Sequence, residues 1–469
     1  MQETPELPAR WRDLFVPGHL TQIAVLCLAL WLHASNSMLT ATTMPTAALE
    51  IGGLHLISWT FALYLMGSIV AGATMGLVVL KLGLKRTMIL ATFVYFVGSV
   101  ICAVAPSMPI MLVGRIVQGL GGGSLVALVY IATDRFFSNR LLPKVIGLTS
   151  VLWLTATLSG PAIGGAFATA GIWRWSYGSF AVQALFLIVA IVFLVKEDKK
   201  DTSPQPAKIP FIRLFWLAAA IFLVSLAGAE FSLWRSPLLV FLGCLALVFF
   251  LVRDRRSSDS RMFPAEVSDL RYAIGSGLLM TFVYCISLMS FLVYGPLILM
   301  ELHGLNPLMA GYVVAAESAA WGFTALIFSN VGSKGEKWVL RAGGITIFVG
   351  TAMMAFVLAS GPVWLILIAA AVGNAGMGMM WGFIIKNVIN SAKAADKERA
   401  STALPSIQQI GFALGAALSG LIANYIGLGD GLTQENLLSA SFWLFTAFLP
   451  LIAIGNIAAW RFTRQLDLP

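Results

Sequence analysis

The sequence predicts an all-α membrane protein with fourteen transmembrane helices. Of its 469 residues, 59% are hydrophobic and 11% are charged, whereas a soluble domain carries roughly 25% charged residues. Fourteen apolar runs follow one another along the chain, and a helix needs about 20 such residues to cross a bilayer. The basic residues between the runs fall almost entirely on one side. These three observations exclude a large soluble protein.

The apolar runs form groups of six, two and six. The first group covers residues 20–46, 55–80, 88–105, 108–133, 145–170 and 178–195. The second group covers 211–229 and 235–252, between two charged stretches. The third group covers 273–300, 309–330, 339–360, 362–388, 401–426 and 437–460. We therefore expect a tail at 1–19, a six-helix bundle at 20–195, a two-helix insertion with its loops at 196–272, a second six-helix bundle at 273–460, and a tail at 461–469.

The distribution of Lys and Arg predicts the orientation in the membrane. With the N-terminus in the cytoplasm, 27 of the 30 basic residues fall in cytoplasmic loops or tails. Only Arg174 and Arg235 fall outside, and Arg115 lies within a run. Positive charge accumulates on the cytoplasmic side of membrane proteins, so we expect both termini in the cytoplasm and a bacterial inner membrane around the chain. The net charge of +9 then reports topology and predicts no nucleic-acid partner.

Several functions are not supported by any motif. The four cysteines and four histidines are scattered, without a CxxC or Cys/His spacing, so no metal site is expected. No catalytic constellation and no GxxxxGK[ST] phosphate loop occurs, so we expect neither an enzyme nor a P-loop ATPase. Uphill transport would have to use an ion gradient, with no cofactor.

Four motifs carry a family resemblance. Gly114–Gly121 reads GRIVQGLG, Gly160–Gly165 reads GPAIGG, Trp173–Trp175 reads WRW, and Gly76–Arg86 reads GLVVLKLGLKR. Together they resemble conserved motifs of the major facilitator superfamily, and GPxxGG resembles the antiporter motif of its drug–proton branch. The six-two-six layout is similar to the fourteen-helix subgroup of that branch.

This resemblance implies the major facilitator fold, with two six-helix bundles plus two extra central helices. It also implies proton-coupled efflux of lipophilic drug-like compounds, cationic ones among them, by alternating access. The partners would be a small amphiphilic substrate, protons and the bilayer, and nothing indicates an accessory periplasmic protein. The residues implied in conformational change are Gly76, Lys81, Gly83, Arg86, Gly160, Pro161, Gly164 and Gly165.

Two positions depart from the family pattern. Leu80 stands where the loop motif has an Asp, and Asn36 stands where the drug-exporter subgroup has an acid before a Thr-rich stretch that ends at Pro45. An amide cannot bind and release a proton near neutral pH, so Asn36 does not supply the coupling that the subgroup pattern implies for the first helix. Two alternatives therefore stay open: export or facilitation of a specific amphiphile, such as a lipid or siderophore, without strict proton antiport, and a membrane sensor that has lost transport.

Glu317 is the only acid well inside an apolar run, and Arg115 is its only cationic counterpart. Charges within the membrane usually line a cavity or pair with one another. We expect Glu317 to carry the proton and Arg115 to tune its site, at a similar depth in the other half of the chain. The alternative is a structural charge, with Glu317 locked to Arg115 or to a neighbouring helix. His33 is a third proton-coupling candidate, with a hydrogen-bonded core residue as its alternative.

A further group of polar, aromatic and Met residues falls within the runs and is expected to line a substrate cavity. Its members are Asn36, Gln118, Tyr294, Trp321, Met380, Trp381, Gln408 and Gln409. Contacts between helices, or with lipid, explain these residues about as well. The charged run from Lys196 to Asp201 and the run Arg253–Arg256 are expected to be solvated loop ends near anionic lipid.

Overall fold

The structure is a computed structural model that describes residues 11–14, 16–138, 140–196, 210–257, 261–393 and 396–466. In these ranges every regular element is helical, and fourteen helical segments are long and apolar enough to cross a membrane. This confirms the predicted all-α membrane protein with fourteen spans. Most of the charged run from Lys196 to Asp201, and parts of both predicted tails, lie outside the described residues.

The N-terminal half consists of helices that follow the first six apolar runs, with short additions. They are α1 (Trp11–Leu14), α2 (Pro17–Ile51), η1 (Leu54–Leu56), α3 (Ile57–Gly72), α4 (Met75–Leu82), α5 (Leu84–Ala103), α6 (Met108–Phe136), α7 (Leu142–Thr169) and α8 (Arg174–Leu194). The central pair is α9 (Phe211–Ala229) and α10 (Arg235–Arg255).

The C-terminal half contains eight helices for six spans. They are α11 (Ala273–Ser287), α12 (Met289–His303), α13 (Pro307–Phe328), α14 (Ser333–Val357), α15 (Val363–Asn390), α16 (Lys397–Tyr425), α17 (Gln434–Thr446) and α18 (Leu449–Gln465). Two expected spans are each broken into two helices: 273–300 breaks at Leu288, and 437–460 breaks before Leu449. Pro450 explains the second break, because proline has no amide hydrogen to continue a helix and is tolerated in a first turn.

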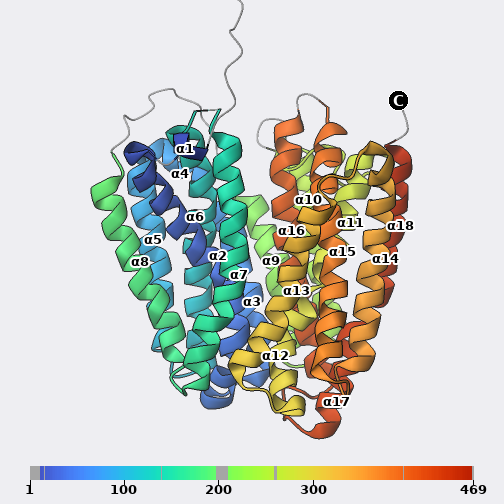
Figure 1. The fold of residues 1–469 in the computed structure, drawn as a ribbon. Helices are drawn as coiled ribbons and strands as arrows, with labels where there is room; N and C mark the ends of the chain where they lie inside the picture. Colours follow the sequence, from blue (N-terminus) through green and yellow to red (C-terminus); the bar gives the residue numbers. More distant parts are fainter. Residues whose placement is uncertain are drawn as a thin grey trace, which may run out of the picture.

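The helices pack as two bundles side by side (Figure 1). In the N-terminal bundle α6 packs against α3 and α5, while α2 packs against α7. In the C-terminal bundle α15 packs against α13 and α14, and α11 packs against α16 and α18. The central helix α9 packs against α10, α16 and α3, so it contacts both bundles.

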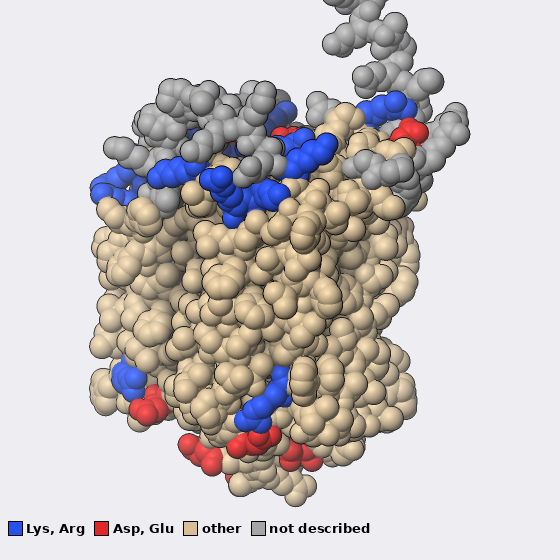
Figure 2. All heavy atoms as spheres, turned by 90° about the vertical axis from the view of Figure 1, so that its left-hand side faces the viewer, with Lys and Arg blue, Asp and Glu red and all other residues tan. Residues whose placement is uncertain are grey.

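Charge divides the molecule into two ends. Lys and Arg gather at one end, which we call the basic end (Figure 2); α1 and the end of α18 also lie there (Figure 1). The two arginines that the sequence places on the opposite side each pair with an acid: Arg174 with Glu50, and Arg235 with Glu230 at 3.2 Å. Each isolated basic residue at the non-basic end is therefore neutralised locally.

The bundles contact each other closely toward the non-basic end. There the Leu308 amide at the start of α13 donates to the Thr169 hydroxyl at the end of α7, at 3.3 Å. Asn424 near the end of α16 donates to the carbonyl oxygen of His55, at 2.8 Å. It also donates to the carbonyl of Gly228 in α9. One amide thus joins the two bundles and the central pair.

Candidate functional site

A network of buried polar groups surrounds Arg115 inside the N-terminal bundle. Arg115 in α6 is fully buried. Its Nε donates to the carbonyl oxygen of Thr60 at 2.8 Å, and its Nη1 donates to Asn36 Oδ1 at 2.8 Å and to Gln118 Oε1 at 2.5 Å. The guanidinium also lies 4.4 Å from the ring centre of Tyr64, a favourable cation–π arrangement. The positive charge is therefore held by neutral groups.

The partners of Arg115 are fixed by further hydrogen bonds. Gln118 donates to the Ser99 hydroxyl at 2.9 Å. Asn36 donates to the Tyr95 hydroxyl at 3.3 Å, and Tyr95 in turn donates to the carbonyl oxygen of Leu32 at 2.7 Å. Asn36 and Gln118 are fully buried, so in this conformation they position Arg115 instead of facing an open cavity.

His33 lies beside this network in α2. It is 7% exposed, its Nδ1 is 2.9 Å from the Tyr64 hydroxyl, and its ring meets Trp153 edge-on. These contacts are those of a hydrogen-bonded core residue, which is the alternative interpretation of His33.

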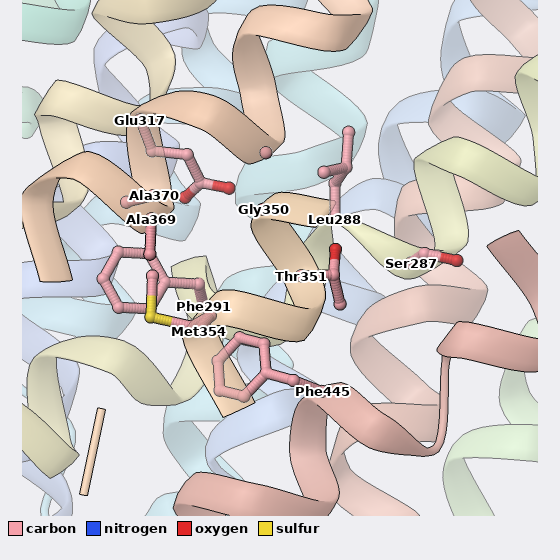
Figure 3. Close-up of a pocket in the computed structure, with 11 residues that line it drawn as sticks. Ser287, Leu288, Phe291, Glu317, Gly350, Thr351, Met354, Ala369, Ala370 and Phe445 are labelled. Atoms are coloured by element: carbon pink, nitrogen blue, oxygen red, sulfur yellow. The ribbon is translucent and has the colours of Figure 1, made fainter. Parts of the chain in front are cut away.

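Glu317 lies in α13 of the other bundle and is 6% exposed. It lines a small cavity whose other lining residues come from α11, α12, α14, α15 and α17 and the break at Leu288: Ser287, Leu288, Phe291, Gly350, Thr351, Met354, Ala369, Ala370, Gly373 and Phe445. The Glu317 carboxyl points toward Gly350, and the Thr351 hydroxyl points into the same space (Figure 3). The cavity has a volume of about 20 Å³, which is room for about one water molecule and far too little for a drug-sized ligand.

Arg115 and Glu317 do not form the ion pair that was the alternative to proton coupling. The hydrogen-bond partners of Arg115 all lie in α2, α3 and α6, whereas Glu317 is enclosed by helices of the C-terminal bundle. Among the residues that the structure describes, Glu317 has no ion-pair partner of its own. Each bundle therefore buries one ionisable side chain, Arg115 or Glu317, that has no oppositely charged partner. Burying such a group costs free energy, and groups of this kind within a membrane usually have a function.

The other expected cavity residues do not gather around either site. Trp321 and Trp381 are half-buried and meet edge-to-face with ring centres 5.8 Å apart. Met380 is fully buried against Gly343, and Tyr294 is buried in α12. Gln409 accepts a hydrogen bond from Ser68 across the bundle interface at 3.3 Å, and Gln408 beside it is half-buried.

The GPxxGG motif lies where α7 contacts α2 and α13. A Cβ on Gly160 would lie 2.5 Å from the Met38 Cβ, and one on Gly164 would clash with the Thr42 hydroxyl. A Cβ on Gly165 would lie 2.6 Å from the Leu308 Cα of the other bundle. Pro161 lies within α7, and its Cβ would lie 3.1 Å from a Cβ on Gly311 of α13. The two halves of the chain are therefore in close contact at this motif.

The loop motif lies at the basic end. Gly76 and the exposed Lys81 belong to the short helix α4, and the exposed Arg86 belongs to the first turn of α5. Gly83 joins the two helices with φ of 82°, a conformation that glycine adopts without strain.

One buried ion pair was missed from the sequence. Asp254 is 2% exposed and accepts from Arg213 Nη1 at 2.6 Å. Asp254 also accepts from the amides of Met262 at 2.9 Å and Phe263 at 3.0 Å. The expectation that Arg253–Arg256 is entirely a solvated loop end is thus wrong for Asp254. The alternation of one acid among three arginines was the available signal.

Comparisons with known proteins agree with this architecture. The family model described as Major Facilitator Superfamily matches residues 26–253 and 277–467. A probable multidrug-efflux transporter of Mycobacterium tuberculosis is 29% identical, over 99% of each chain. The multidrug efflux pump SdrM of Staphylococcus aureus is 21% identical, over 93% of this chain and 95% of its own.

Solved structures share the fold at low identity. A D-xylose–proton symporter superposes with a TM-score of 0.64 at 15% identity, over 96% of this chain and 98% of its own. A peptide transporter superposes with a TM-score of 0.67 at 16% identity, over 95% and 96%. Fourteen apolar spans, arranged as two bundles and a central pair, the motifs at the bundle contact and the family match together show that the chain is a multi-pass membrane transport protein of the Major Facilitator Superfamily, and not an enzyme.

Proposed function

We propose that this protein exports lipophilic compounds in exchange for protons, and that Glu317 carries the proton. Relatives that match the chain over nearly its full length are named multidrug-efflux transporters, which supports the substrate class. The observation that carries the coupling is the buried Glu317, which shares a water-sized cavity with the Thr351 hydroxyl.

Chemistry favours Glu317 over the other buried candidates. Arg115 stays charged in proteins and cannot release its proton, and Asn36 has no titrating group. His33 is held by the Tyr64 hydroxyl within the Arg115 network. A buried carboxyl group that has no cationic partner has nothing to stabilise its charged form. Such a group can exchange a proton when water reaches it. The small cavity provides the place for that water.

The arrangement of the bundles supports a transport cycle of alternating access. We place the basic end in the cytoplasm, because basic residues favour that side. The contacts of Leu308 with Thr169 and of Asn424 with His55 then join the two bundles on the external side. Rocking of one bundle against the other would break these contacts and open the external side.

The test is Glu317→Gln in proteoliposomes with an imposed pH gradient. A glutamine keeps the shape of the side chain but cannot carry a proton, so we expect ethidium-driven proton movement to fall by at least about tenfold, as for loss of a group essential to the step. Ethidium binding, measured by fluorescence, is expected to remain. The matched control is Glu301→Gln, which neutralises an exposed acid at the end of α12 and should transport like the wild type.

Proton movement by Glu317→Gln at the wild-type rate would refute the assignment. The second candidate is export of a specific amphiphile without strict proton antiport. One observation favours it: Arg115 donates to the amide of Asn36, at a position where the drug-exporter subgroup has an acid that could carry a proton. Flux that is unaffected by the pH gradient, in a panel of lipids, siderophores and drugs, would select this candidate. Binding without any flux would indicate a sensor.

A further inference from the structure

The basic end of the central helix pair carries a groove that the proposed transport cycle does not use. The groove has a volume of about 550 Å³ and lies between the start of α9 and the end of α10. Its lining residues are Pro210, Phe211, Ile212, Arg213, Arg253, Arg256 and Ser257. Three of these seven residues are arginines and none is acidic, so the groove is suited to an anion.

Two of the three arginines keep their charge available to a ligand. The charge of Arg213 is matched by Asp254 in the buried ion pair, and Asp254 is further occupied by two backbone amides. Arg253 and Arg256 are exposed at the mouth of the groove. In the part of the chain that the structure describes, neither has a carboxylate partner. Paired guanidinium groups bind phosphate oxygens with good geometry.

The surface that continues from the groove into the membrane region is apolar and aromatic. Phe211 at the groove is 70% exposed, and Phe215 follows four residues later on the same face of α9. The Trp216 ring stacks on Phe249 of α10 at 5.2 Å and contacts the Phe215 ring at 5.7 Å. Phe215 and Phe249 are both exposed. A ligand that fits both regions has an anionic head group and hydrocarbon chains.

We propose that this groove binds an anionic phospholipid of the leaflet at the basic end. Its phosphate lies between Arg253 and Arg256, and its acyl chains lie along Phe211, Phe215 and Phe249. Because α9 packs against α3 and α16, a lipid seated there also lies against the helix that contacts both bundles. The proposal does not depend on the identity of the transported substrate.

The experiment titrates the purified protein in detergent with phosphatidylglycerol and counts bound lipids by native mass spectrometry. We expect phosphatidylglycerol to bind and phosphatidylcholine, which has no net charge, to bind much more weakly. Arg253→Gln combined with Arg256→Gln should weaken phosphatidylglycerol binding by about fivefold or more, because basic side chains provide the attraction to anionic lipid. Phe215→Ala combined with Phe249→Ala should weaken it as well, without altering the charge.

The matched control removes the same charge elsewhere at the basic end. Arg255 and Arg271 are exposed and do not line the groove, so Arg255→Gln combined with Arg271→Gln should bind phosphatidylglycerol like the wild type. Equal losses in the two double variants would show a diffuse charge effect and overturn the site. Displacement of the lipid by millimolar inorganic phosphate, with no effect of the phenylalanine variants, would show a free-anion site and also overturn it.

Discussion

At the scale of single residues, the buried charge of Arg115 links α6 to α2 and α3 of the N-terminal bundle. Asn36 supplies one of its three hydrogen-bond acceptors. Asn36→Leu leaves the guanidinium without this acceptor, and a hydrogen bond to a charged group contributes roughly 1.5–3 kcal/mol. We expect the free energy of unfolding to fall by about this amount, measured by chemical denaturation in detergent micelles. Asn36→Asp keeps an acceptor for Arg115 but loses the donor to the Tyr95 hydroxyl, so it should lie between Asn36→Leu and the wild type.

The neighbouring Ser37 provides the control for this series. It is half-buried in the same turn of α2, and Arg115 does not contact it among the hydrogen bonds of the described residues. Ser37→Ala should therefore leave the unfolding free energy nearly unchanged. If Asn36→Leu were as stable as Ser37→Ala, the amide of Asn36 would not be supporting Arg115.

At the scale of helices, the close contact between α7 and α13 requires a glycine at position 165. A Cβ on Gly165 would lie 2.6 Å from the Leu308 Cα, and a backbone atom cannot rotate away. Gly165→Ala should therefore separate the two helices and lower stability by about 1–3 kcal/mol, the usual cost of overpacking. The measurement is the thermal unfolding midpoint in detergent.

Gly382 in α15 is the matched helical glycine, with nothing within 4 Å of its would-be Cβ. Gly382→Ala should be neutral or should stabilise by up to about 1 kcal/mol through helix propensity. Equal effects of alanine at Gly165 and at Gly382 would contradict the view that the close approach of α7 and α13 is what requires glycine.

The fourteen spans could be predicted from the sequence. Hydropathy identifies the segments that lie in the hydrocarbon region of the membrane, and the basic residues identify the loops on the cytoplasmic side. They do not predict the break at Leu288, which lies inside a continuous apolar run. Nor do they predict the burial of Asp254, because this depends on the packing of α9, α10 and residues 262–263.

For the candidate site, the sequence identifies the charges but not their neighbours. Arg115 and Glu317 stand out because charged residues are rare within apolar runs. Their separation into two enclosed sites depends on the direction in which each helix face points. Asn36 and Gln118 are polar within apolar runs, as a cavity lining would be, yet they serve as acceptors for Arg115. Composition alone cannot distinguish these two uses of an amide.

At the scale of the whole molecule, the two bundles are joined at the end opposite the basic residues, and this joint offers a direct test of alternating access. The amide nitrogen of Leu308 lies 3.3 Å from the Thr169 hydroxyl, so the two residues are neighbours across the bundle interface. Cysteines at both positions can form a disulfide if their Cα atoms lie within about 7 Å. The four native cysteines are free and would first be replaced by serine or alanine.

Thr169→Cys combined with Leu308→Cys, once oxidised, should hold the non-basic end closed. If the bundles must separate there in every cycle, transport in proteoliposomes should stop on oxidation and return after reduction. Thr169→Cys alone is the control and should transport under both conditions. Mass spectrometry measures the fraction of cross-linked protein. Undiminished transport by fully cross-linked protein would mean that this joint does not open during the cycle, and that substrate crosses the membrane without the rocking motion proposed for the two bundles.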